Sequence, residues 1–278
     1  MARIVDTIPS FEDFARRAFL ESPVLREQMW RTVYERANPE VFAAFREGDD
    51  GAGRTPEALV RELSKVRARV TEAAPIVREV INQVEPAVVA ALGLPPEPAP
   101  AHALLVGTMT TNAKVGRLGG EVALFHCLEW FQSRESAEVS IAHEAAHAWH
   151  QVALGTEPPG DDDLAWTTFS EGLAVQVSRA VVPGRSEYDY FWYGYPGFED
   201  WVDWCESHRT ELVAQMAAAL DEPGGADAFF GPGLTEGRWR TGYYVADLVV
   251  AGLKTPLADL ARLGVDAARG LVRAALSS

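Results

Sequence analysis

The chain has 278 residues, and its content of 47% hydrophobic and 23% charged residues is that of a globular protein with a sizeable core. Its 40 acidic and 25 basic residues give a formal net charge of −15. Nucleic acids and anionic membrane surfaces are themselves negatively charged, so this balance excludes both as expected partners.

The N-terminus predicts no secretory signal, because Met1–Asp6 has no apolar core and the charged Glu12 and Asp13 follow. No apolar run is long enough to cross a bilayer. Cys127 and Cys205 are the only cysteines, and we expect reduced, partly buried thiols rather than a disulfide. The expected location is cytoplasmic, and the oligomeric state is left open.

The first ninety or so residues have the apolar spacing of helices. Phe11, Phe14, Phe19 and Leu20 recur at helical intervals, and a second stretch runs from Val24 to Val33. A polar break at Gly48–Gly51 precedes a longer helical pattern over 56–92. Proline removes a backbone donor and clashes with the preceding turn, so we expect Pro75 and Pro86 to divide that pattern.

The proline-rich stretch Leu94–Pro100 cannot continue a helix and predicts a domain boundary between 1–94 and 101–278. Two short apolar runs bounded by glycines, Ala103–Gly107 and Glu121–Leu128, then predict buried strands. The glycines of Gly116–Gly120 predict the turn between them. The fold class is therefore α+β, predominantly helical, with a small sheet.

A helix is predicted next, with Ser136 as its N-cap and its end near Leu154. Gly155–Asp163, with its three successive aspartates, predicts a solvated loop. Another helix is expected from Thr168 to Val181. Further along, the aromatic-rich Tyr188–Trp204 segment precedes two more expected helices, Leu212–Leu220 and Thr241–Leu253.

The segment from His143 to His147 reads His-Glu-Ala-Ala-His. Residues four apart on a helix lie about 40° apart in projection, so His143 and His147 share one face and can bind one ion. Glu144 lies about 100° round from His143, where a carboxylate can accept a proton from water. Two neutral imidazoles with an adjacent carboxylate predict a catalytic site for one zinc ion.

A catalytic zinc needs a third protein ligand, and Glu171 is the first candidate. The alternative is a capping box, in which Glu171 bonds the backbone N–H of Thr168 at a helix start. His150 is the rival ligand, but it lies roughly 10 Å along the helix from His143, which leaves it at most an outer contact.

The pairing of His143-Glu144-x-x-His147 with Glu171, in a Ser-Glu-Gly-Leu-Ala setting, resembles the gluzincin clan of zinc metallopeptidases. The resemblance implies His143, His147 and Glu171 as zinc ligands and Glu144 as the general base. Gly237–Tyr244 is similar to the Trp-x-x-Gly-Tyr stretch of an uncharacterised family of predicted Zn-dependent proteases.

That second similarity covers the chain from about Ala103 to the C-terminus. It implies a zincin-like catalytic domain over 101–278 with an active-site helix, preceded by an N-terminal helical region over 1–94. Ala246 stands where the family pattern leads us to expect a glycine. The Gly-x-Met-Glu-Asn stretch of aminopeptidases is missing, so recognition of a free N-terminus is not expected.

Hydrolysis needs a donor for the negative charge that develops on the substrate's carbonyl oxygen. Tyr243 is the first choice through the resemblance, Tyr244 and Arg240 come next, and His208 is weaker. Glu121–Leu128 is expected to form an edge strand along which a peptide lies. His126 on that strand is expected to be structural.

The aromatic side chains of the segment after Pro183 either wall an apolar cleft or cover the core; they are Tyr188, Tyr190, Phe191, Trp192, Tyr193 and Tyr195. The expected function is a zinc-dependent peptidase acting on a peptide or protein substrate. Two alternatives remain: a non-catalytic zinc-binding or interaction protein on the same scaffold, and a zinc amidohydrolase with a non-peptide substrate.

Overall fold

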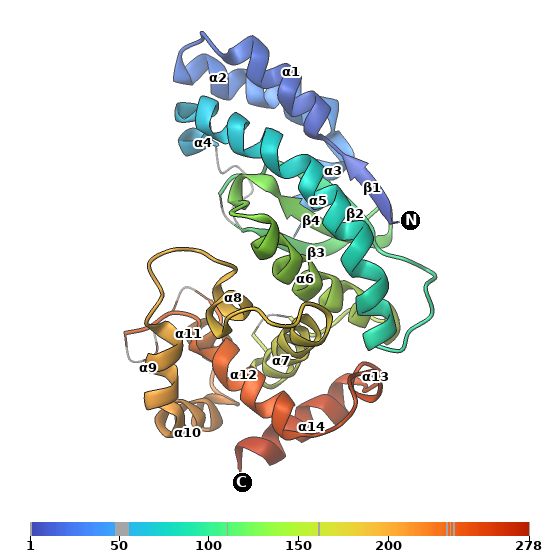
Figure 1. The fold of residues 1–278 in the computed structure, drawn as a ribbon, viewed down its shortest axis with the longest axis vertical. Helices are drawn as coiled ribbons and strands as arrows, with labels where there is room; N and C mark the ends of the chain where they lie inside the picture. The colour runs from blue at the N-terminus through green and yellow to red at the C-terminus, as the bar shows by residue number, and fades with distance from the viewer. Residues whose placement is uncertain are drawn as a thin grey trace. The chain divides into compact units, whose positions relative to one another are not determined.

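The fold is known from a computed structural model, which describes residues 2–47, 56–109, 111–160, 162–231, 233, 235 and 237–277. It is mainly helical with one small sheet, as the composition and periodicity predict (Figure 1). The predicted break at Gly48–Gly51 lies outside the described residues. No helix in the described ranges is both long and apolar enough to cross a membrane.

The chain forms two compact units, and each combines two separate stretches of sequence. The first unit consists of Met1–Gln83 and Pro98–Ala137, and the second of Val84–Glu97 and Glu138–Ser278. The sequence-based division at 94–101 follows the order of the chain, whereas here Val84–Glu97 belongs with the C-terminal unit. Helices α5 (Leu63–Ala91) and α6 (Arg134–Leu154) each contribute to both units.

The sheet of the first unit has the strand order β1-β2-β4-β3. Strand β2 (Ala101–Leu105) pairs in parallel with β1 (Arg3–Asp6) and with β4 (Glu121–Cys127), while β3 (Ala113–Leu118) pairs antiparallel with β4. Every residue of β2 is buried, in keeping with a sequence that is apolar apart from His102.

One expectation about this sheet is wrong, and a second is confirmed only in part. Strand β4, predicted as an edge strand, is interior because it pairs with β2 on one side and β3 on the other; the edges are β1 and β3. Gly116 lies within β3, and the turn is formed by Gly119 and Gly120, whose φ values of +64° and +85° suit glycine. The pairing of β1 with β2 joins residues about a hundred apart in sequence, a contact that local patterns do not reveal.

Short helices follow β1 in the first unit: α1 (Ile8–Ala18), α2 (Pro23–Met29), the π-helix η1 (Trp30–Glu35), α3 (Pro39–Phe45) and α4 (Glu57–Arg61). The side chains of Phe11 and Phe14 are fully buried against Trp30 and Tyr34. Phe19 and Leu20, predicted to continue that stripe, are instead exposed where α1 ends.

Helix α5 runs unbroken from Leu63 to Ala91 and contains both Pro75 and Pro86, so the predicted division at these prolines is wrong. Each proline removes one helical hydrogen bond. That loss is offset by the apolar stripe of the helix, in which Val70, Val80 and Val88 are fully buried.

The short 3-10 helix η2 (Leu128–Trp130) connects β4 towards α6. Helix α6 begins two residues before the predicted cap. Ser133 Oγ accepts a hydrogen bond from the backbone N–H of Ser136 at 3.2 Å, so Ser133 caps the helix and Ser136 lies in its first turn.

The second unit is helical: α7 (Leu164–Val181), α8 (Glu187–Trp192), α9 (Trp201–Ser207), α10 (Arg209–Ala219), α11 (Gly225–Phe229), α12 (Thr241–Gly252), α13 (Leu257–Leu260) and α14 (Val265–Leu276). Helix α7 packs against α12 and α14 (Figure 1). Its apolar face is deeply buried, with Phe169, Ala174 and Val177 fully withdrawn from water. Cys127 and Cys205 are both buried, and neither forms a disulfide in the described part of the chain.

Candidate metal centre

Three side chains from two helices of the second unit converge on one point. His143 Nε2 lies 3.0 Å from His147 Nε2 and 3.0 Å from Glu171 Oε2, and His147 Nε2 lies 3.4 Å from the same Glu171 oxygen. The structure thus brings together the three residues that the sequence predicts as ligands. Among the described residues this is the one group of three potential metal-ligating side chains whose ligand atoms all come within 4.8 Å.

The local sequence explains how α6 presents its two histidines. His143 and His147 are one turn apart, so they project from the same side of the helix. Small residues lie between and beside them, and Ala142, Ala145 and Ala146 are all buried. Their short side chains allow the neighbouring segments to approach α6 closely.

Helix α7 starts at Leu164, where Asp163 caps it by accepting a hydrogen bond from Trp166 N at 2.9 Å. Thr168 lies inside this helix and donates its hydroxyl hydrogen to the Leu164 carbonyl at 2.7 Å. The capping-box alternative for Glu171 is therefore wrong, because Thr168 is not at a helix start. Of the predicted solvated aspartates, Asp163 has this structural role, Asp162 is exposed, and Asp161 lies outside the described residues.

The donor atoms fit a zinc ion in chemistry and in spacing. Zinc accepts imidazole nitrogen and carboxylate oxygen, and two such ligands of a tetrahedral ion are about 3.3–3.6 Å apart. The observed separations of 3.0, 3.0 and 3.4 Å lie close to that range. A set of two nitrogens and one oxygen leaves the ion an open position, as catalytic zinc sites require.

The outer contacts of the two histidines differ. His147 Nδ1 lies 3.1 Å from Ser170 Oγ, a contact that fixes the orientation of the ring. His143 Nδ1 is buried and has no hydrogen-bond partner among the described residues. Ser170 directly precedes Glu171, so one turn of α7 both supplies one candidate ligand and contacts another.

Opposite charges stabilise the ionised form of Glu171. Burial would raise the pKa of this carboxyl, but His147 and His143 outweigh burial and hold the pKa far below its usual range. Burial would likewise lower the pKa of His147, but the charges of Glu171 and Glu144 raise it above its usual value. Glu144, half-buried on α6, therefore interacts electrostatically with His147.

His150 is not part of the cluster. Its ring stacks on Trp166 at a centroid distance of 5.4 Å and contacts Phe169 at 5.8 Å. Burial, with a smaller contribution from His147, lowers the pKa of His150 to about 4, so the ring is neutral at physiological pH. It packs in the core as an uncharged aromatic side chain, although Nε2 finds no hydrogen-bond partner in the described part of the chain.

Three further side chains border the cluster, from the end of α8 and the start of α12. The ring of Tyr193 lies 5.8 Å from that of His143, and the ring of Tyr243 lies 6.2 Å from it. The guanidinium carbon of Arg240 lies 4.2 Å from the Tyr243 ring centroid and 5.9 Å from that of Tyr193. The sequence predicts Tyr243 and Arg240 as site residues, whereas it indicates Tyr193 only as one of several aromatics.

Tyr193 and Arg240 share an unusual backbone conformation. Both are left-handed, with φ values of +51° and +61°. Non-glycine residues adopt this region at a cost of about 1–3 kcal/mol, and they cluster at functional sites. Burial raises the pKa of the Tyr193 hydroxyl well above its usual value, with Glu144 and Glu171 adding to the effect of burial and Arg240 opposing it. The hydroxyl therefore keeps its proton.

The other predicted site residues lie elsewhere. Tyr244 is buried against Phe191, at 6.4 Å between ring centroids. His208 stacks on Trp204 at 4.1 Å. His126 is buried in the sheet of the first unit, where its Nε2 lies 3.0 Å from Nδ1 of His102, in agreement with the predicted structural role.

The aromatic segment after Pro183 mainly covers the core. Trp192 stacks on Phe198 at 3.7 Å between ring centroids, and Phe191 contacts Trp201 at 5.2 Å. Tyr190 donates its hydroxyl hydrogen to the Val182 carbonyl. Only Tyr193 of this predicted group has a described ring contact with a candidate ligand.

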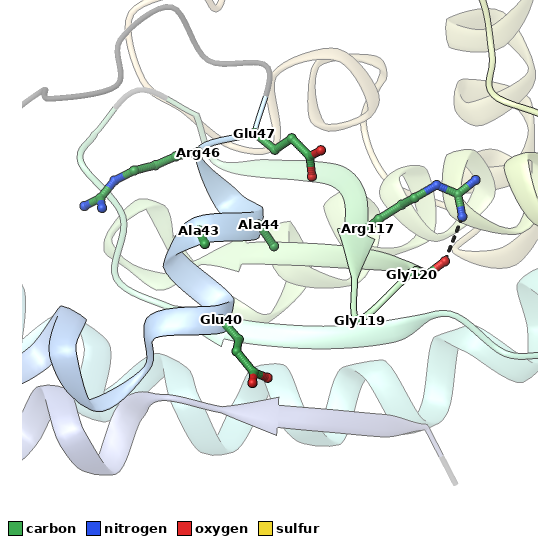
Figure 2. Close-up of a pocket in the computed structure, with 8 residues that line it drawn as sticks. All are labelled: Glu40, Ala43, Ala44, Arg46, Glu47, Arg117, Gly119 and Gly120. Carbon is green, nitrogen blue, oxygen red and sulfur yellow. Dashed lines mark hydrogen bonds between the residues drawn. The ribbon is translucent and has the colours of Figure 1, made fainter.

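A separate pocket of about 660 Å³ lies in the first unit, between α3 and the Gly119–Gly120 turn (Figure 2). Its two arginines are already bonded, since Arg46 pairs with Glu35 and Arg117 donates to the Gly120 carbonyl at 2.9 Å. None of the candidate zinc ligands lines this pocket.

Comparisons with known proteins add no relative: no protein-family model, no curated protein and no solved structure matches this chain. The resemblance to gluzincins therefore rests on the motif residues themselves.

Proposed function

We propose that this protein is a zinc-dependent hydrolase, a gluzincin-like peptidase whose zincin-like catalytic part contains α6 and α7. The observation that supports this most strongly is the convergence of His143 Nε2, His147 Nε2 and Glu171 Oε2 within hydrogen-bond distance. Two imidazoles and a carboxylate on two packed helices form a suitable ligand set for zinc.

Zinc, when bound, supplies Lewis acidity and a water of lowered pKa. Glu144 stands next to the ligand His143 on α6 and takes the proton of the attacking water as general base. It then delivers this proton to the departing amine, so one carboxylate serves both halves of the reaction. A site that only binds zinc for stability would not need a carboxylate at this position.

Tyr243 and Tyr193 donate hydrogen bonds to the substrate carbonyl oxygen as it gains negative charge. Their rings flank His143 at 6.2 and 5.8 Å. The raised pKa of Tyr193, caused mainly by burial, keeps its hydroxyl protonated and able to donate. Tyr244 lies against Phe191 rather than against a ligand, so we give it no part in the reaction.

Peptide-library cleavage tests the proposal, with wild type compared with Glu144→Gln and with Glu157→Gln as the control. Glu157 is an exposed carboxylate in the loop that precedes α7. We expect Glu144→Gln to retain zinc but to lose cleavage, and Glu157→Gln to keep both. The proposal fails if zinc-loaded wild type cleaves no peptide in the library, or if Glu144→Gln cleaves as fast as wild type.

A further inference from the structure

Arg240 is a cation beside the candidate metal centre that forms no ion pair with a carboxylate of the described residues, although it interacts electrostatically with Glu171. Its guanidinium donates from Nη2 to the Phe191 carbonyl at 3.3 Å and bonds the Tyr193 side chain, both of which are uncharged. Its Nε is sealed from solvent and has no hydrogen-bond partner in the described part of the chain. The cation is thus held in place without a countercharge bonded to it.

Other arginines of the second unit are arranged differently. Five form ion pairs with carboxylates: Arg179, Arg185, Arg238, Arg269 and Arg273. Arg209 and Arg262 form no ion pair with a described residue, but both are exposed to water. Arg240 is half-buried and forms no ion pair with a described residue, so the charge of Glu171, which acts on it without an ion pair, is its only carboxylate compensation in the described part of the chain.

Aromatic faces hold the Arg240 guanidinium in place. Its central carbon lies 4.2 Å from the Tyr243 ring centroid and 5.1 Å from that of Trp192. Contact with aromatic rings stabilises a cation through its face, and it leaves the in-plane N–H groups at the edge available for hydrogen bonds. That edge is the fork that binds a carboxylate with two parallel hydrogen bonds.

The surrounding backbone adds to this arrangement. Arg240 has a left-handed conformation, which arginine adopts at a cost, so the position of this side chain is enforced by its surroundings. Helix α12 begins at the next residue, and the N-terminus of a helix carries a partial positive charge. The hydroxyl of Thr241, the first residue of α12, is also buried without a hydrogen-bond partner among the described residues.

We infer that Arg240 binds a carboxylate of the substrate and so determines which substrates the site accepts. The source of the carboxylate is either the C-terminus of a peptide or an acidic side chain. The role as a substrate determinant rests on the proposed hydrolase function, whereas carboxylate binding by Arg240 does not depend on bound zinc.

Nuclear magnetic resonance titration of the metal-free, ¹⁵N-labelled full chain tests the inference, with the arginine Nε–H signals as the readout. The probes are N-acetylalanine and its neutral amide, and the α-amide of N-acetylglutamic acid and its neutral glutamine analogue. We expect at least one acid to bind about tenfold to a hundredfold more tightly than its neutral match. The Nε–H signal of Arg240 should shift with the same affinity.

Arg240→Lys and Arg240→Asn are the test variants, and Arg238→Lys is the matched control. Lysine keeps the charge but lacks the fork, and asparagine is among the residues that tolerate a left-handed backbone. Both Arg240 variants should lose most of the preference for the acid, while Arg238→Lys, altered at a surface pair with Asp200, should keep it. The acid probe that binds with the higher affinity identifies the source of the carboxylate.

Wild type that binds neither acid, or binds acids and neutral probes equally, would overturn the inference, and this comparison needs no variant to fold. Acid binding that leaves the Nε–H signal of Arg240 unmoved would also overturn it. If the carboxylate preference holds while zinc-loaded protein cleaves no peptide, the Arg240 site stands and the hydrolase proposal falls. The two failures are therefore distinguishable.

Discussion

A Cβ atom added to Gly172 on α7 would lie 2.3 Å from the backbone carbonyl oxygen of Ala246 on α12. No real Cβ contact is that short, so the two helices can lie this close only with glycine at position 172. Gly172 directly follows the candidate ligand Glu171, and α12 carries Tyr243. This close approach therefore sets the distance between the ligand and the side chains that border it.

Replacing Gly172 with alanine should force α7 and α12 apart. We expect the free energy of unfolding to fall by about 1–3 kcal/mol, the usual cost of an overpacked core, with zinc affinity falling as Glu171 moves. Gly270→Ala in α14 is the control, because its Cβ would meet nothing within 4 Å. That change should stabilise the protein by about 0.5–1 kcal/mol, since alanine favours a helix interior over glycine. Chemical denaturation measures the free energy of unfolding of both variants. A Gly172→Ala protein as stable as wild type would contradict the packing argument.

Ser170 should matter for zinc affinity without being a ligand. Its Oγ lies 3.1 Å from His147 Nδ1 and orients the imidazole of this candidate ligand. Ser170→Ala should weaken zinc binding about tenfold to a hundredfold, as outer partners of metal-bound histidines usually do. Competition with a fluorescent zinc chelator measures the affinity. Ser178→Ala on the same helix is the control, because its hydroxyl donates only to the Ala174 carbonyl.

Tyr193→Phe should impair turnover while leaving the metal in place. Loss of one hydrogen-bond donor to a developing oxyanion typically lowers kcat about 10²- to 10³-fold. The phenylalanine ring keeps the contact with His143, so zinc content should match that of wild type. Tyr244→Phe, which alters a hydroxyl next to no candidate ligand, should keep wild-type kcat. Steady-state kinetics on a cleaved library peptide measures kcat and KM separately. An unchanged kcat in Tyr193→Phe would contradict the assignment.

The buried Glu129 in the first unit should make stability depend on pH. Its carboxyl group accepts hydrogen bonds from Gly107 N and Met109 N. Burial nevertheless raises the pKa of Glu129 from its usual 4.5 to about 7. Between these values the folded state binds more protons than the unfolded state, so this residue's contribution to the free energy of unfolding falls as pH rises. The loss reaches about 3 kcal/mol near pH 7 and above.

Glu129→Gln removes that titration, so the difference in unfolding free energy between variant and wild type should change across pH 4.5–7. Urea denaturation at a series of pH values measures it, and the comparison cancels contributions from the other titrating groups. Glu40→Gln controls for the loss of an exposed carboxylate. If the difference in unfolding free energy between Glu129→Gln and wild type stays constant with pH, Glu129 does not titrate between pH 4.5 and 7.

The sequence predicts the parts of this protein that depend on local spacing. The relation of His143 to His147 is one turn of helix, and Glu171 is a candidate third ligand because a zinc site with only two protein ligands would be incomplete. The apolar runs of β2 and β4 are visible for the same local reason. The non-local parts are not: β1 pairs with β2 across nearly a hundred residues, and β3 converts β4 from an edge strand into an interior one.

Tyr193 and Arg240 show a second limit of prediction from sequence. Their left-handed backbones, at φ values of +51° and +61°, are imposed by packing and carry no signal in residue type. A glycine or asparagine would have indicated such a turn, but tyrosine and arginine do not. The prolines of α5 show the opposite case, in which a local signal is present but the predicted structure is not. Pro75 and Pro86 predict a break, yet the helix is continuous because burial of its apolar face stabilises it.

Zinc content and coordination, measured on protein purified without chelators, test the central claim most directly. We predict about one zinc per wild-type chain, bound by two imidazole nitrogens and carboxylate oxygen in the X-ray absorption spectrum. His147→Ala and Glu171→Ala should take up far less zinc, and His150→Gln should retain it. Wild type that takes up no zinc, or zinc that remains fully bound in His147→Ala, would contradict the account.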